Sequence, residues 1–161
     1  MDFDRVIVDG YSLLYRWREM EPRAAGGSLL RQRQALMRLL EETATALARR
    51  VTVVFDGRGQ KAEAGDESEI IEVLFSPGHQ TADTLIERLA ASSPAADRVL
   101  VVTSDRAERE TVLASGAHAM SCGVFLERCQ EIHRNVRRQT RPSPKAARGA
   151  TLADVFPEGK K

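Results

Sequence analysis

Four short runs of apolar residues punctuate the chain, and each has the length of a β-strand. They occupy residues 5–9, 51–55, 70–75 and 99–103, and residues 117–120 form a weaker fifth run. Continuous hydrophobicity without alternating polar positions is typical of strands that are covered on both faces. The pattern therefore predicts a sheet that lies inside the protein.

Between these runs, apolar residues recur at the three- and four-residue spacing of amphipathic helices. The longest such stretch consists of Leu29, Leu36, Leu39, Leu40, Thr43, Ala44 and Leu47. Three shorter stretches follow: Ala82, Leu85, Ile86, Leu89 and Ala90; Ala107, Glu110, Leu113 and Ala114; and Phe125, Cys129, Ile132 and Val136. Residues 57–69, rich in glycine and charge, predict a mobile loop instead. Alternating helices and buried strands predict an α/β fold, a three-layer α/β/α sandwich around a mainly parallel sheet.

The composition fits one globular domain followed by a basic segment. Of 161 residues, 42% are hydrophobic and 29% charged, so a single domain can bury a core whereas two domains could not. We expect the domain to span residues 1–138 and residues 139–161 to form an extended tail. The two cysteines are too few for a disulfide framework, and the N-terminal residues resemble neither a signal peptide nor an anchor. We therefore expect a cytoplasmic protein without membrane contact, of undetermined oligomeric state.

Positive charge gathers near the C-terminus, although the formal net charge of the whole chain is only +1. The cations beyond His133 are Arg134, Arg137, Arg138, Arg141, Lys145, Arg148, Lys160 and Lys161, and the acids are Asp154 and Glu158. Such a run favours contact with RNA phosphates through the release of counterions. A solvated tail without a partner is the alternative, and the charge pattern leaves both interpretations open.

Aspartates follow the predicted strands. Asp9 ends the first strand, Asp56 follows the second, and Asp105 lies just beyond the fourth. Asp83 begins the helix after the third strand. Because ligands bind beyond the carboxyl ends of strands in open α/β sheets, we expect these four side chains to meet at one edge. A hard divalent cation, Mg²⁺ or Mn²⁺, would relieve their repulsion and would assist phosphodiester hydrolysis.

Each aspartate also has a purely structural interpretation. Asp9 and Asp56 precede glycines, as in ordinary turns, and Asp83 suits the positive end of its helix. Asp105 suits an N-cap, with Glu108 completing a capping box. For any one aspartate the two interpretations are about equally good, but four at one predicted edge favour the metal site.

Four segments resemble the YacP-like NYN domains, a branch of the PIN-like ribonucleases. They are Val-Ile-Val-Asp-Gly-Tyr-Ser at residues 6–12, Val-Val-Phe-Asp-Gly at 53–57, Val-Leu-Phe at 73–75 with Thr-Ala-Asp at 81–83, and Val-Thr-Ser-Asp-Arg-Ala-Glu at 102–108. The resemblance spans most of the chain. It implies a PIN-like sheet, a Mg²⁺ or Mn²⁺ site of strand-end acids, and endonucleolytic cleavage of RNA. The family is also associated with ribosome-dependent mRNA decay, which makes mRNA the expected substrate and the ribosome a partner to test.

Carried over to this chain, the resemblance assigns catalytic roles to all four acids. It makes Asp9, Asp83 and Asp105 the metal ligands, and Asp56 a further acid near the metal. The family commonly has Asp-Gly-Tyr-Asn at the first strand end, whereas this chain has Ser12 in place of the asparagine. A hydroxyl lacks the paired donor and acceptor of an amide, so the substrate would be positioned less firmly and activity could be lower.

Residues beside the acids offer further contacts to RNA. The polar residues expected to contact the substrate are Ser12, Ser104, Arg16, Arg58, Lys61 and Arg106. Isolated surface arginines usually have no specific partner, which is the alternative for these cations. The aromatic residues after the first strand are Tyr11, Tyr15 and Trp17. They could stack on bases or pack in the core, and the sequence favours neither.

The leading hypothesis is a metal-dependent endoribonuclease, and the alternative is a catalytically weak or silent RNA- or ribosome-binding module with the same fold. A small-molecule phosphohydrolase ranks below both, because no second acid follows Asp9 two residues later. Cys129 and His133 lie one helical turn apart, but a zinc site would need two further ligands in recognisable spacing. Cys129 is therefore more simply a core residue.

Overall fold

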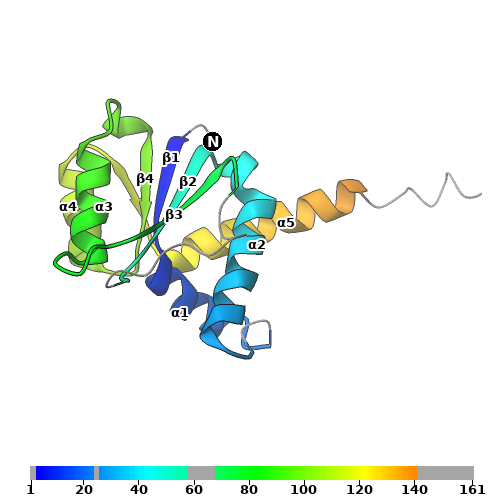
Figure 1. Cartoon of the computed structure of the whole chain (residues 1–161). Coiled ribbons are helices and arrows are strands. Elements are labelled where there is room, and N and C mark those ends of the chain that lie inside the picture. Colours follow the sequence, from blue (N-terminus) through cyan, green and yellow to red (C-terminus); the bar gives the residue numbers. More distant parts are fainter. Residues whose placement is uncertain (1–2, 24–25, 58–67, 141–161) are drawn as a thin grey trace, which may run out of the picture.

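The computed structural model describes residues 3–23, 26–57 and 68–140. Its centre is a five-stranded sheet in which all neighbouring strands are parallel. In chain order the strands are β1 (Phe3–Asp9), β2 (Ala48–Phe55), β3 (Ile71–Phe75), β4 (Val99–Val102) and β5 (His118–Met120). They lie in the order β3-β2-β1-β4-β5, with β1 in the middle (Figure 1). Each predicted apolar run thus forms a strand.

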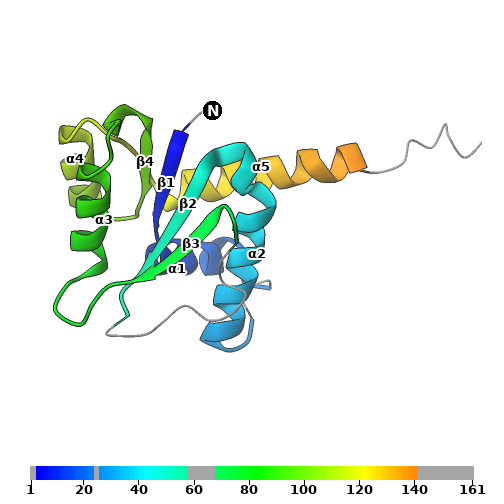
Figure 2. The same cartoon turned by 45° about the horizontal axis from the view of Figure 1, so that its top comes forward.

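Helices cover both faces of the sheet, which confirms the predicted three-layer α/β/α sandwich (Figures 1 and 2). One face carries α1 (Gly10–Met20), α2 (Leu29–Leu47) and α5 (Cys122–Thr140), and the other carries α3 (Ala82–Ala91) and α4 (Arg106–Ala114). A short 3-10 helix, η1 (Ala96–Arg98), precedes β4. On β1, Val6 and Val8 pack into the first layer and Ile7 into the second, which explains why the strand has no polar alternation.

The middle strand lies where the chain reverses its progress across the sheet. From β1 the chain moves outward to β2 and β3, and α3 then carries it back to β4, on the other side of β1. The carboxyl ends of β1 and β4 are therefore neighbours. After β1 the chain continues toward β2, and after β4 it continues toward β5, on the opposite side of the sheet. In open α/β sheets this switch point is where ligands bind.

The first helix, α1, is not predicted from the sequence. It starts at Gly10, immediately after β1, and its buried side chains include Leu13, Leu14 and Trp17. That spacing covers little more than one turn, too short for a helical period to stand out. Asp9 caps the helix by accepting a hydrogen bond from the backbone N–H of Ser12. One residue therefore ends the strand and starts the helix.

The sequence predicts the existence of α4 but the wrong buried face. The buried residues of this helix are Glu108 and Val112, whereas Ala107 and Glu110 are exposed and Leu113 is 56% exposed. The helix is short and has few apolar residues, so one exposed leucine is enough to shift the assigned face. The observed face turns Glu108 inward, toward the carboxyl edge of the sheet.

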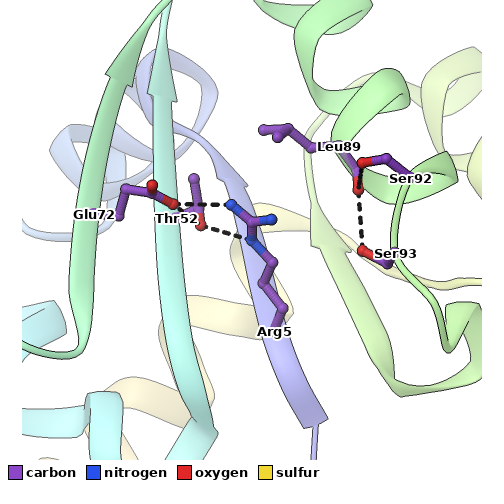
Figure 3. Close-up of polar contacts among 6 residues, drawn as sticks. All are labelled: Arg5, Thr52, Glu72, Leu89, Ser92 and Ser93. Atoms are coloured by element: carbon purple, nitrogen blue, oxygen red, sulfur yellow. Dashed lines mark hydrogen bonds and ion pairs between the residues drawn. The ribbon is translucent and has the colours of Figure 1, made fainter.

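A polar network joins three neighbouring strands on the face that carries α3 (Figure 3). The Arg5 guanidinium on β1 donates to the Thr52 hydroxyl at 2.9 Å and to a Glu72 carboxylate oxygen at 2.8 Å. Thr52 in turn donates to Glu72 at 3.0 Å. Because a one-residue slip of a strand would turn these side chains to the other face, the network helps to fix the register of β1, β2 and β3.

Two predicted segments lie largely outside the described residues. The loop predicted over residues 57–69 includes residues 58–67, and the tail predicted over residues 139–161 includes residues 141–161. The last described element, α5, ends at Thr140. Within the described part of the chain, no helix has the length and apolar character needed to cross a membrane.

Candidate metal-binding site

Three acidic side chains converge at the switch point. Asp9 ends β1, Asp83 is the second residue of α3, and Glu108 is the third residue of α4. Each offers a carboxylate oxygen, and these oxygens all lie within 4.8 Å of one another. Asp9 and Glu108 are buried, while Asp83 is exposed at the mouth of the cluster. The acids thus come from three elements that meet only in the folded chain.

Of the three acids, Glu108 has the most unusual environment for a carboxyl group. It is 5% exposed, and among the described residues neither carboxylate oxygen accepts a well-formed hydrogen bond, although the Thr103 side chain is close enough to affect its pKa. Burial raises its pKa to about 7; the Thr103 side chain opposes the rise, and the charges of Asp83, Asp9 and Asp105 add to it. A buried carboxylate with so little hydrogen bonding is favoured in its protonated form, or in a charged form that a cation pairs with.

The pKa of Asp83 is also raised. Partial burial is the largest cause, followed by the negative charges of Asp9, Asp105, Glu87 and Asp56. All four aspartates predicted from the sequence are therefore close enough to interact electrostatically. Such mutual repulsion favours the binding of a cation.

Asp9 is held in place by Ser12, one turn into α1. One Asp9 oxygen accepts from the Ser12 backbone N–H at 3.2 Å, and the other accepts from the Ser12 hydroxyl at 2.7 Å. The two bonds fix the rotamer of the Asp9 carboxylate. The residue that departs from the family's asparagine thus directly contacts a site acid.

Asp105 and Asp56 lie beside this cluster. Asp105 caps α4, accepting from the backbone N–H of Ala107 at 2.7 Å and of Glu108 at 3.2 Å. The capping interpretation holds for Asp105, but the predicted capping box is wrong, because the Glu108 carboxylate turns inward. Asp56 is exposed and accepts from the Ser76 hydroxyl at 3.3 Å. Neither aspartate belongs to the set of oxygens within 4.8 Å of one another.

The glycines after Asp9 and Asp56 provide space for aromatic rings under this edge. A Cβ atom at Gly10 would overlap the Phe55 ring, and one at Gly57 would overlap Phe75. The two rings are stacked with their centroids 5.6 Å apart. The two Asp-Gly pairs are therefore explained by close packing, since neither glycine has a positive φ.

Two hollows adjoin at the site. The first, which we call the acidic hollow, has a volume of about 540 Å³ and is lined by Asp9, Asp56, Asp83, Thr81, Tyr11 and Leu29, among others. The second, the basic hollow, has a volume of about 560 Å³ and is lined by Arg16, Arg109, Glu19, Ser104, Ser121 and Gly123. Ser12 and Tyr15 line both, so the hollows share a wall.

A sequence profile of the YacP-like NYN domain matches residues 6–158. The chain belongs to this family. It is 31% identical over 140 residues to YacP of Bacillus subtilis (strain 168), covering 86% of this chain and 82% of that protein. Crystal structures of Rae1 (YacP) from Bacillus subtilis align with it. A point mutant gives a TM-score of 0.70 at 28% identity over 94% of this chain and 89% of that one. A second structure gives 0.68 at 29% identity over 86% and 80%.

Membership in the NYN family gives the chain a PIN-like nuclease fold, whose carboxyl edge bears the acids described above. Among the other predicted site residues, Ser12, Ser104 and Arg16 line the basic hollow. Arg106 is exposed on α4 and pairs with Glu110 at 3.2 Å. Arg58 and Lys61 lie outside the described residues.

The three aromatic residues of α1 were expected either to stack on bases or to pack in the core, and they differ in exposure. Trp17 is 4% exposed and belongs to the core. Tyr11 is half-buried with its ring edge-on to Phe55, at a centroid distance of 5.0 Å. Tyr15 is 57% exposed on the wall between the hollows. Of the three, Tyr15 therefore has the most accessible ring, although the Arg18 guanidinium lies over it at 5.9 Å from the centroid.

The zinc alternative finds no support in the described residues. Cys129 is fully buried in the core, and the His133 imidazole contacts a carboxylate oxygen of Glu42 on α2. The cluster of metal-ligating side chains found in residues 3–23, 26–57 and 68–140 is that of Asp9, Asp83 and Glu108. The sequence did not identify Glu108 as a site residue, because the wrong face of α4 was predicted to be buried. The four-residue spacing between Glu108 and Val112 was the available signal that these two residues share a buried face.

Proposed function

We propose that this NYN domain is a divalent-metal-dependent endoribonuclease that cleaves RNA by phosphodiester hydrolysis. The observation that carries the proposal is the buried, unpartnered carboxylate of Glu108, which lies with Asp9 and Asp83 at the switch point of a PIN-like nuclease fold. A binding module without chemistry has no need of three mutually repelling carboxylates. A phosphodiester nuclease does, because a metal ion held there neutralises the charge of the substrate.

The donor set fits Mg²⁺ or Mn²⁺. All three groups offer only oxygen, which hard cations prefer, and the exposed position of Asp83 leaves room for water and substrate. Asp9, Asp83 and Glu108 would hold the ion, with Asp105 and Asp56 adding negative charge nearby. When bound, the ion would stabilise negative charge on the phosphodiester and make water a better nucleophile.

The chain's own residues prepare this site in separate ways. Ser12 orients Asp9 through two hydrogen bonds, so the carboxylate cannot rotate freely. The pKa of Glu108, near 7, lets this carboxyl release its proton when a cation arrives. Tyr15 presents an exposed ring beside the acids, on which a base of single-stranded RNA can stack.

We further propose that the substrate is mRNA in the cytoplasm and that the ribosome is a partner. This part rests on the family resemblance and on the cations of the C-terminal sequence, including Arg134, Arg137 and Arg138 at the exposed end of α5. Positive charge there favours contact with an RNA backbone. Cleavage of free RNA and of mRNA on translating ribosomes can be compared directly to test it.

The test of the nuclease is metal-dependent cleavage of a labelled single-stranded RNA by the full chain. We expect cleavage with Mg²⁺ or Mn²⁺ and none with a chelator. Asp83→Asn should lower the rate by more than about a hundredfold, because it removes a ligand while nearly preserving its shape. The matched control is Asp97→Asn, an exposed aspartate in η1, at the opposite end of β4.

Circular dichroism and melting curves of both variants check that the fold is intact. Wild-type cleavage by a folded Asp83→Asn protein would show that the site is assigned wrongly. If the wild-type chain binds RNA but does not cleave it with either metal, the binding-module alternative is correct. The serine in place of the family's asparagine is the feature that favours that alternative.

A further inference from the structure

The basic hollow is lined by side chains typical of a phosphate-binding site. None of the acids of the candidate metal site lines it. Two guanidinium groups, from Arg16 on α1 and Arg109 on α4, line it together with the hydroxyls of Ser104 and Ser121. Its one carboxylate is that of Glu19. The charged side chains thus leave an excess of positive charge, whereas those of the acidic hollow are all aspartates.

Both arginines are oriented by the fold. The Arg16 guanidinium lies against Gly123, where a Cβ atom would approach its Nε to 3.2 Å, and one of its nitrogens donates to Glu19 at 2.9 Å. Arg109 is half-buried and donates to the Thr103 backbone carbonyl at 3.0 Å. A guanidinium has five N–H donors, so each arginine keeps donors for a ligand.

The start of α5 adds further donors to the same wall. Ser121 precedes the helix, and its hydroxyl accepts from the backbone N–H of Val124 at 3.4 Å. Gly123 lies in the first turn of this 19-residue helix, where backbone N–H groups have no acceptor within the helix. Anions are favoured at such a helix start, in support of the two arginines.

We propose that the basic hollow binds an internal backbone phosphate of the RNA strand next to the phosphate that is cleaved in the acidic hollow. This inference rests on the proposed nuclease function. The two hollows share Ser12 and Tyr15, so a strand that lies across this wall places neighbouring phosphates in sites of different character. Metal neutralises one phosphate, the arginines hold the other, and the Tyr15 ring is available to the base between them.

The position of the basic hollow gives it a role in orienting the substrate. A phosphate fixed by two arginines limits how far the RNA strand can slide past Asp9 and Asp83. Without that limit, any phosphate of the RNA could reach these two acids. Arginine suits this task because its planar donors match phosphate geometry. The same chemistry would also accept a terminal 5′-phosphate, and the experiment distinguishes the two sources.

The experiment measures binding of a short fluorescent oligouridylate to the full chain, by anisotropy, with a chelator present so that no cleavage occurs. The variants are Arg16→Gln and Arg109→Gln, and the matched control is Arg88→Gln, in the last turn of α3. We expect each hollow variant to bind about tenfold more weakly, since a hydrogen bond to a charged group is lost. The slope of log affinity against log salt should fall by about 0.7, as for one lost phosphate contact on a single strand.

Arg109→Lys guards against a purely structural effect, because it retains the charge and should recover most of the salt slope. Each protein is tested with an oligonucleotide carrying a 5′-hydroxyl and with the same oligonucleotide carrying a 5′-phosphate. Equal dependence on the arginines for both supports an internal phosphate. Dependence only with the 5′-phosphate overturns the proposal in favour of end recognition, and so do unchanged affinity and slope in Arg16→Gln and Arg109→Gln.

Cleavage assays on the same proteins separate this inference from the proposed function. If the wild-type chain fails to cleave RNA but its binding depends on Arg16 and Arg109, the phosphate site stands and the nuclease does not. If it cleaves RNA and the arginines have no effect on binding, the nuclease stands and the phosphate site does not.

Discussion

Replacing Glu108 with glutamine should stabilise the metal-free protein at alkaline pH. Below about pH 4.5, the ordinary pKa of glutamate, Glu108 is protonated in the folded and the unfolded chain alike. Between 4.5 and about 7 only the folded chain keeps the proton, so the stability that the neutral side chain contributes is lost as pH rises through this interval. Above about pH 7 the folded protein carries a buried charge that is poorly compensated by hydrogen bonds.

The magnitude follows from the width of that interval. At about 1.4 kcal/mol per pH unit, the span from 4.5 to about 7 corresponds to roughly 3–4 kcal/mol. Screening and local relaxation of the structure offset part of this, and we expect roughly 2 kcal/mol. Glutamine has nearly the same shape and no charge, so Glu108→Gln should be that much more stable than wild type at about pH 8 and close to it at about pH 5.

The assay is denaturant unfolding with a chelator present, at both pH values, for wild type and Glu108→Gln. Glu110→Gln is the control, since Glu110 is exposed on the same helix. Adding Mg²⁺ at about pH 8 should stabilise wild type and should stabilise Glu108→Gln less, because the variant has lost a ligand. The reasoning is refuted if the glutamine variant is no more stable than wild type at about pH 8, or if its advantage is the same at both pH values. Either result would mean that burial does not disfavour the ionised Glu108 carboxylate.

Two further predictions concern the surroundings of the acids. Gly10→Ala should lower the free energy of unfolding by about 1–3 kcal/mol, measured by chemical denaturation, because its Cβ would overlap the buried Phe55 ring; an unchanged midpoint would contradict the packing described for this edge. Tyr15→Ala should weaken binding of single-stranded RNA by about 1–3 kcal/mol while Tyr15→Phe binds nearly normally, and equal binding by all three proteins would exclude stacking on this ring.

Strands and fold were predictable because their signal is local. Residues 51–55 and 99–103 are apolar apart from Thr52 and Thr103, and at such short length that pattern is typical of a strand covered on both faces. The helix at Gly10–Met20 was not predicted, because its buried apolar side chains span only about one turn. In addition, the helix follows its strand with no linker to mark its start. What identifies that helix is the bond from Ser12 to Asp9, which depends on three-dimensional geometry.

The candidate site was predictable to the extent that strand ends determine it. Asp9 and Asp83 come together because parallel strands bring their carboxyl ends to one edge, and this follows from topology alone. Glu108 depends on which face of a short helix is buried, and Leu113 is an apolar residue that nonetheless points to solvent. Arg16 and Arg109 are far apart in the chain and have no shared motif, so only folding reveals the hollow they line.

The dual position of Asp9 has a consequence for how the proposed activity can be lost. Asp9 is at once a site acid and the N-cap of α1, and asparagine caps a helix as well as aspartate does, whereas alanine costs about 1 kcal/mol. An Asp9→Asn change exchanges an oxygen for a nitrogen, abolishes a charge that a metal requires, and leaves the strand-to-helix junction intact. If the proposed nuclease function holds, one nucleotide change in the Asp9 codon would thus give a folded protein that lacks metal-dependent cleavage but keeps the residues of the basic hollow.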